Sequence, residues 1–178
     1  SFGLLPERCL NGKGRVFGGK ESYWYEIKPA DKEKTLSIVN LVLDSLGAMR
    51  GTIQYSYIGY KAASQRSKLS TFTSEKEYIT DLQKRIPYTN IEHFEFQNAD
   101  DSSKPLVLKL DVVIQAFDNL NTNQFLLNPF MGERLENNPF KSSERSYPVD
   151  FGAPLEEILV FSMIYPKNFE IDELPAKV

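Results

Sequence analysis

The stretch "PLVLKLDVVIQAF" at residues 105–117 decides the fold class of this chain. Apolar residues occupy every second position, and they are Leu106, Leu108, Leu110, Val112, Ile114 and Ala116. The positions between them carry Val107, Lys109, Asp111, Val113 and Gln115. Successive side chains of a strand point to opposite faces of a sheet, so this alternation predicts a half-buried β-strand.

Other parts of the chain predict more strands. "GTIQYSYIGY" at 51–60 alternates in the same way, and the run 36–43 is apolar enough for a strand packed on both sides. "LDSLGAMRG" at 43–51 reads as a hairpin connection in which Gly47 supplies a permissive backbone position. The remaining predicted strands are "SYWYEIKP" at 22–29, "IEHFEFQN" at 91–98, "NQFLLNPF" at 123–130, "EEILVFSMIYP" at 156–166 and "NFEIDEL" at 168–174.

One region breaks the strand pattern. "TSEKEYITDLQKRIP" at 73–87 offers Ser74 as an N-cap, Glu77 as its capping-box partner and Pro87 as a terminator. The preceding residues 60–70 predict a shorter helix. Strands without regular strand–helix alternation favour a mainly β fold, and we expect an antiparallel β-sandwich with one short helical insertion at about residues 60–86.

Composition excludes some classes of protein. The chain has 178 residues, with 21 Lys and Arg against 24 Asp and Glu, so nucleic acid is not an expected partner. No apolar stretch approaches the length of a membrane span. The first residue is Ser1, and the turn-like, charged opening suggests a fragment of a longer protein.

Catalytic chemistry finds little support in the residues. Cys9, the only cysteine, could act as a nucleophile with the only histidine, His93, but no third orienting group is indicated. One Cys and one His do not make a zinc site, and Asp100 and Asp101 lack the spacing of a calcium loop. We therefore predict no catalytic residue, no cofactor and no metal ligand, with Cys9 a space-filling thiol.

Two groups of residues are candidates for binding or for anchoring a loop. Trp24, with Tyr23 and Tyr25, could form a platform that stacks on a sugar or a peptide, although aromatic residues on strands more often pack in a core. Arg145 and Asp150 flank a Tyr-Pro pair, and we expect them to anchor a connection through a charge-assisted hydrogen bond.

Four stretches carry a family resemblance. They are "LPERCLNGKGR" at 5–15, "GTIQYSYIGYKAASQR" at 51–66, "NPFKSSERSYPVDFG" at 138–152 and "EEILVFSMIYPKNFEIDELP" at 156–175. Together they resemble the C-terminal region of unknown function that follows the transglutaminase-like, papain-fold domain in large bacterial envelope proteins. In such proteins the catalytic Cys, His and Asp lie upstream, which implies that Cys9 is a bystander. Relatives continue beyond "IDELP" into further strands, which implies an open sheet edge that a neighbouring chain could fill.

The resemblance implies a division of the chain and a function. Residues 1–22 would be a linker or first hairpin continuing from an absent transglutaminase-like domain, and residues 23–178 the β-sandwich. The expected function is a non-catalytic accessory module in the periplasm or cell envelope, with the upstream transglutaminase-like domain as its partner. The alternative is an independent glycan- or peptide-binding β-sandwich.

Overall fold

A computed structural model of the chain describes most of its residues. The described residues are 4–6, 9–10, 12–19, 21–29, 31–86, 88–115, 127–131, 144, 146 and 151–174. They form seven strands and two helices. The strands are β1 (Gly12–Gly18), β2 (Glu21–Ile27), β3 (Glu33–Leu43), β4 (Ala48–Gly59), β5 (Thr89–Gln97), β6 (Leu106–Gln115) and β7 (Leu155–Ile164), and the helices are α1 (Tyr60–Leu69) and α2 (Glu75–Arg85). This confirms the predicted mainly β fold with helical residues between 60 and 86.

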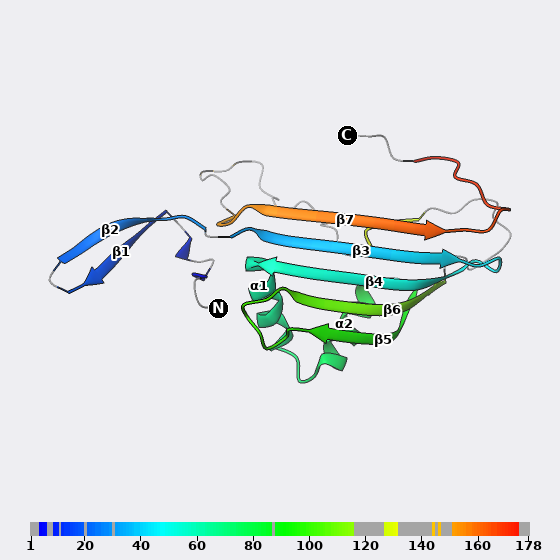
Figure 1. The fold of residues 1–178 in the computed structure, drawn as a ribbon, viewed down its shortest axis with the longest axis horizontal. Helices are drawn as coiled ribbons and strands as arrows, with labels where there is room; N and C mark the ends of the chain where they lie inside the picture. The colour runs from blue at the N-terminus through cyan, green and yellow to red at the C-terminus, as the bar shows by residue number, and fades with distance from the viewer. Residues whose placement is uncertain are drawn as a thin grey trace.

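The described strands make two sheets. β1 and β2 form an antiparallel hairpin, and the larger sheet has the order β5-β6-β4-β3-β7 (Figure 1). Three of its four strand pairs are antiparallel, but β7 pairs parallel to β3 in an unbroken register from Glu33–Leu155 to Val42–Ile164. The expectation of a wholly antiparallel arrangement is therefore wrong for this pair, because β7 returns to the sheet through a long connection that crosses to the end where β3 begins.

The alternation in β6 is what the sequence predicted. Leu106, Leu108, Leu110, Val112 and Ile114 are all buried, whereas Lys109, Asp111 and Gln115 are exposed. Residues of β3 and β4 on the same face of the sheet join them in one core, among them Leu41, Met49, Ile53, Tyr55 and Tyr57. The core thus lies on one face of the five-stranded sheet.

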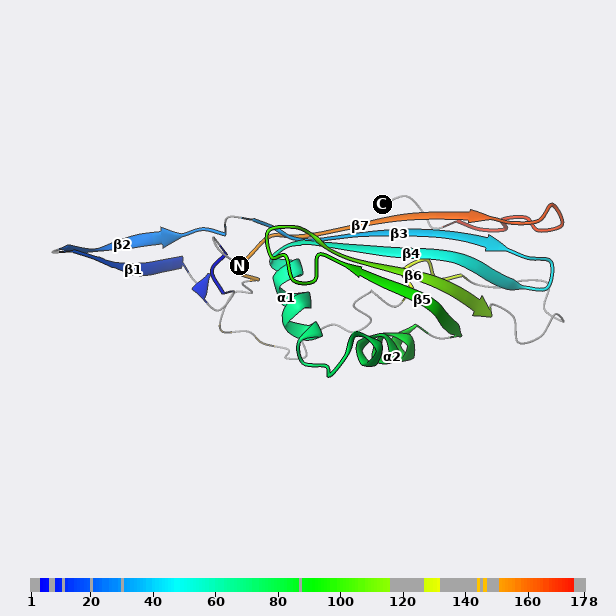
Figure 2. The ribbon, with the colours of Figure 1, turned by 60° about the horizontal axis from the view of Figure 1, so that its bottom comes forward.

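Two helices cover this buried face (Figure 2). The α2 N-cap forms as predicted, because the Ser74 hydroxyl accepts from the Glu77 backbone N–H at 3.2 Å. The Glu77 carboxylate in turn accepts from the backbone N–H of Thr73 at 2.8 Å. Tyr78, Ile79 and Leu82 of α2 are buried against the sheet. Neither helix is long and apolar enough to cross a membrane, a finding that covers the described residues.

The opposite face of the sheet is open where β3 and β7 lie. Val42 of β3 is 50% exposed, its neighbour Ile164 in β7 is exposed as well, and so is Val160 on the same face of β7. The prediction that 36–43 is packed on both sides is therefore wrong. In the described part of the chain the second layer is helical and covers only one face, and the two-stranded sheet projects from one end of the molecule instead of stacking on the larger sheet (Figures 1 and 2).

The turns follow local chemistry. Gly47 has φ 86° in the β3–β4 connection, where the Asp44 side chain accepts from the backbone N–H groups of Leu46 and Ala48. Gly59, which joins β4 to α1, has φ 60°, and a Cβ there would lie 2.3 Å from the carbonyl oxygen of Lys32. The predicted strands at 123–130 and 168–174 are not strands over their described residues, 127–130 and 168–174.

Candidate binding surfaces

The β1–β2 hairpin exposes a concentration of aromatic side chains. We call this hairpin the aromatic arm; Phe17 is 81% exposed and Trp24 64%, and Tyr23 and Tyr25 are exposed to a similar degree. Sequence reasoning predicted that Tyr23, Trp24 and Tyr25 share a strand, which is confirmed, and the structure places them all in solvent. The alternative, that these rings are core residues, is therefore wrong for this chain.

The register of the hairpin sorts its side chains onto two faces. Arg15 lies opposite Trp24, and Phe17 follows on the same face as these two residues. The Arg15 guanidinium carbon lies 5.5 Å from the Trp24 ring centroid and 5.7 Å from that of Phe17. Arg15 also donates to the Ser22 hydroxyl at 2.7 Å, which holds the guanidinium between the rings. Tyr23 and Tyr25 lie on the other face of the ribbon.

Burial at the root of the arm packs it against the start of α1 and the segment that precedes β7. Ile27, at the end of β2, packs on a small cluster of Leu10, Tyr60 and Ala153. Beyond this point the hairpin continues as an isolated pair of strands, an arrangement that is marginally stable in water by itself. Exposed aromatic residues on such a ribbon are typical of a surface that contacts another molecule.

The sulfur and imidazole groups lie on different parts of the fold. Cys9 is half-buried, its backbone N–H donates to the Pro6 carbonyl at 2.8 Å, and it adjoins Leu10 at the root of the arm. His93 is exposed in β5, opposite Asp111 of β6. None of the contacts found among the described residues joins Cys9 to His93. In that part of the chain no group of three or more His, Cys, Asp or Glu residues is arranged to hold a metal ion.

A groove of about 600 Å³ lies where α2 ends and β5 begins. Its lining includes Arg50, Gln83, Lys84, Tyr88, Asn90 and Glu92. Tyr88 is 70% exposed, and its φ of 58° is uncommon for a residue with a large side chain. In the lining of the groove, a guanidinium nitrogen of Arg50 lies 3.8 Å from a carboxylate oxygen of Glu92. Sequence reasoning missed this groove because the residues come from four separate elements and carry no local motif.

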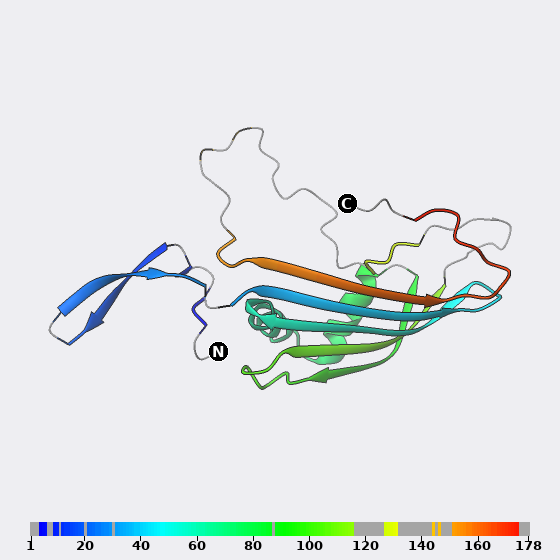
Figure 3. The ribbon, with the colours of Figure 1, turned by 45° about the horizontal axis from the view of Figure 1, so that its top comes forward.

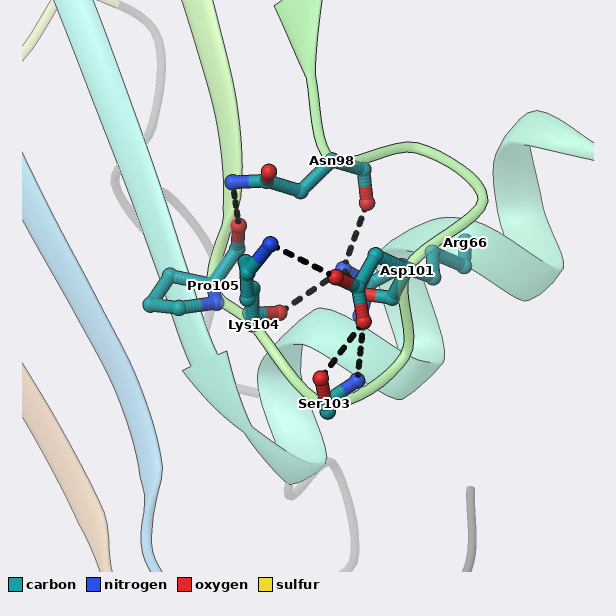
Figure 4. Close-up of polar contacts among 6 residues, drawn as sticks. All are labelled: Arg66, Asn98, Asp101, Ser103, Lys104 and Pro105. Carbon is teal, nitrogen blue, oxygen red and sulfur yellow. Dashed lines mark hydrogen bonds and ion pairs between the residues drawn. The ribbon is translucent and has the colours of Figure 1, made fainter.

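Arg66 of α1 anchors the β5–β6 connection, and sequence reasoning missed it as well. Its guanidinium donates to the carbonyl oxygens of Asn98, Asp101 and Lys104, each at 2.8 Å (Figure 4), and to that of Ala99 at 3.0 Å. Asn98, with φ 60°, donates from its side-chain amide to the Pro105 carbonyl. The segment 98–105 is thus an ordered turn organised by one cation, and the sequence signal was limited to the Asn and Asp residues that favour turns.

The acidic groups of this turn serve the turn itself. Hydrogen bonds from the Ser103 hydroxyl, and then from the Lys104 ammonium, lower the pKa of Asp101 to about 2. The distances are 2.6 Å to the hydroxyl and 2.9 Å to the ammonium (Figure 4). Asp101, one of the two carboxylates considered as calcium ligands, is thus bound within the turn itself. The predicted anchor pair, Arg145 and Asp150, lies outside the described residues.

A second charged cluster lies where β7 begins. The Glu156 carboxylate contacts the Lys32 ammonium at 2.5 Å and the Lys34 ammonium at 2.7 Å. The hydrogen bond from Lys32, and then that from Lys34, lower the pKa of Glu156 to about 2. The hydrogen bond to Glu156 in turn raises the pKa of Lys32. Lys34 belongs to β3, so the cluster ties the start of β7 to its neighbour strand.

Comparison with protein families finds a match to the C-terminal part of the chain. Residues 123–178 match the family described as Domain of Unknown Function with solved-structure structure (DUF3858). This segment contains β7 and makes up about a third of the chain. No curated protein and no solved structure matches the chain. The C-terminal segment is therefore similar to a domain family whose function is unknown.

Proposed function

We propose that this chain is a non-catalytic accessory module of a bacterial transglutaminase-like protein of the periplasm or cell envelope, and that the aromatic arm contacts the transglutaminase-like domain. The observation that carries the proposal is the projecting hairpin with Phe17 and Trp24 exposed around Arg15. Aromatic and Arg side chains are the residues that most often carry binding energy at protein interfaces.

The position of the arm in the chain supports this partner. The hairpin starts at Gly12, within the stretch 5–15, which resembles the sequence that follows the catalytic residues in such proteins. A module that continues from a catalytic domain has its first elements closest to that domain.

The single tryptophan allows a direct test. The chain is labelled with 5-fluorotryptophan, which places the probe at Trp24 alone, and is titrated with the separately produced transglutaminase-like domain while fluorine NMR follows the label. We expect the Trp24 resonance to shift or broaden on binding. Trp24→Ala lacks the label, so its affinity is measured by isothermal titration calorimetry, and the substitution should weaken the complex by at least about tenfold, as expected for an interface hot spot.

A matched control uses another exposed apolar residue. Leu46, in the β3–β4 turn, is 75% exposed and far along the sheet from the arm (Figure 1). Leu46→Ala should leave the affinity unchanged. An unshifted Trp24 resonance with saturating domain, or equal weakening by both substitutions, would count against the arm as the contact surface.

The second candidate function is glycan or peptide binding by the same aromatic surface. The specific observation in its favour is the Trp24 ring, which is exposed and oriented by Arg15, because sugar rings and peptide side chains stack on such faces. Soluble peptidoglycan fragments, which contain both glycan and peptide, are a suitable probe. Quenching of Trp24 fluorescence that saturates with these fragments, and no response to the transglutaminase-like domain, would favour this candidate over the first.

A further inference from the structure

We propose that β7 is a dimerisation edge, at which the β7 strand of a second copy of this chain pairs antiparallel and joins the two five-stranded sheets. This inference goes beyond the proposed function and involves a different part of the molecule. Among the described strands β7 is the last in the sheet, with β3 on one side only (Figure 3).

The composition of β7 is unusual for an edge. From Ile158 to Ile164 it reads "ILVFSMI", with no charged residue and no proline, and its register with β3 contains no bulge. Natural sheet edges usually carry charged residues, proline or a bulge because unpaired backbone groups on a flat apolar strand attract another strand. Ile158, Val160 and Ile164 are 39%, 46% and 69% exposed. The strand thus has the features of a pairing surface.

The apolar run complements itself when it is reversed. In an antiparallel pair centred on Phe161, Ile158 lies opposite Ile164 of the second copy, and Leu159 lies opposite Met163. The only polar residue, Ser162, lies opposite Val160. The alternation also matches, because Leu159, Phe161 and Met163 pack toward the core while the other side chains of the run face outward. A two-fold axis at Phe161 is therefore compatible with both faces of the sheet.

The charges at the ends of β7 select this orientation. A parallel, in-register pair would put Glu156 and Glu157 opposite their own copies, and like charges directly opposite each other are destabilising. The antiparallel pair leaves both carboxylates outside the apolar run.

The oligomeric state of the isolated chain is the first measurement. Sedimentation velocity over a micromolar concentration series should show a reversible dimer. Val160→Lys places a cation within the run and should weaken the dimer by at least about tenfold. Thr52→Lys adds the same charge to the exposed outer face of β4, away from the edge, and should leave the dimer unchanged. Ser162→Lys, at an exposed position, repeats the test without removing apolar surface, and circular dichroism checks that each variant folds.

Disulfide trapping tests the orientation. In a Cys9→Ser background, Ile158→Cys and Ile164→Cys are made separately and mixed under oxidising conditions. Antiparallel pairing puts these two positions at the Cα separation that a disulfide spans, so the mixture should yield a crosslinked dimer that neither variant forms alone. Crosslinks between identical positions would overturn the antiparallel arrangement. A monomer throughout the concentration series, or a dimer unaffected by both lysine substitutions at the edge, would overturn the proposal as a whole.

Discussion

The two edges of the five-stranded sheet differ in almost every physical respect. β5 carries Glu92, His93 and Glu95 in exposed positions and a register irregularity between Ile91 and His93. α2 packs beneath this edge through Tyr78, whose ring meets that of Phe96 edge-on at 5.7 Å. β7 carries no charge between Ile158 and Ile164 and keeps an unbroken register with β3.

The difference shows how a sheet edge is kept from pairing with another chain. Charges and a bulge make β5 a poor template for a further strand, and the helical layer supplies the apolar cover for its inner face. β7 lacks these features, and its own charges are confined to the Glu156–Glu157 end, where Lys32 and Lys34 neutralise Glu156. The contrast predicts that stability is concentrated on the β5 side and association on the β7 side.

The largest effect is expected from a substitution in the helical layer that covers the inner face of the β5 edge. Tyr78→Ala removes a ring that is 3% exposed and that contacts both Phe72 and Phe96. Truncating a buried aromatic residue leaves a cavity, so we expect a loss of about 3–5 kcal/mol in the free energy of unfolding. Phe161→Ala, which truncates a partly buried ring of β7, should cost less. Urea unfolding of both variants checks the order, and equal losses would contradict the contrast between the edges.

The next effect concerns the turn that joins β5 to β6. Arg66→Ala leaves four carbonyl oxygens without their shared donor. Hydrogen bonds from charged groups each contribute about 1.5–3 kcal/mol, and water replaces part of this. We therefore expect a loss of about 2–4 kcal/mol in the free energy of unfolding. Arg66→Lys keeps the charge but lacks the planar fork that reaches several acceptors, so it should restore only part of the loss. Thermal unfolding measures both, and full rescue by lysine would show that charge alone anchors the turn.

Local sequence patterns predicted the parts of this contrast that depend on local chemistry. The alternation of Leu106, Leu108 and Leu110 fixed the buried face of β6, and Ser74 with Glu77 marked the start of α2. Turn chemistry likewise placed the β3–β4 hairpin at Gly47. These features depend on residues a few positions apart, so the pattern contains the necessary information.

Long-range features were not predictable in the same way. The parallel partner of β7 is set by where a connection of some forty residues returns, and the donors to segment 98–105 come from Arg66, more than thirty residues earlier. The aromatic residues 23–25 predicted a strand but not its exposure, because burial depends on whether another layer covers the strand. The groove at Tyr88 was not predicted either, because its lining comes from four elements that are separate in the sequence.

A smaller effect, on the β7 side, is pH dependent. The pKa of Glu156 is lowered in the folded chain to about 2 from 4.5, so its contacts with Lys32 and Lys34 contribute stability that is fully present above about pH 4.5. This contribution is lost as the pH falls through the interval down to about 2. Glu156→Gln should therefore reduce the stability near neutral pH and flatten its dependence within that interval. Unfolding curves at several pH values compare the variant with the parent chain, and parallel profiles would contradict the assignment to Glu156.

The smallest effect on stability should come from the aromatic arm, which belongs to neither edge. Trp24 is 64% exposed and contacts mainly Arg15, so Trp24→Ala should change the free energy of unfolding by no more than about 0.5 kcal/mol. Arg15→Ala should behave alike, because the cation–π contacts and the Ser22 hydrogen bond are solvent-exposed. Urea unfolding checks both variants. A large loss would mean that the hairpin packs on the sheet and is not available to a partner, whereas unchanged stability with reduced binding would separate the role of these side chains in recognition from any role in the fold.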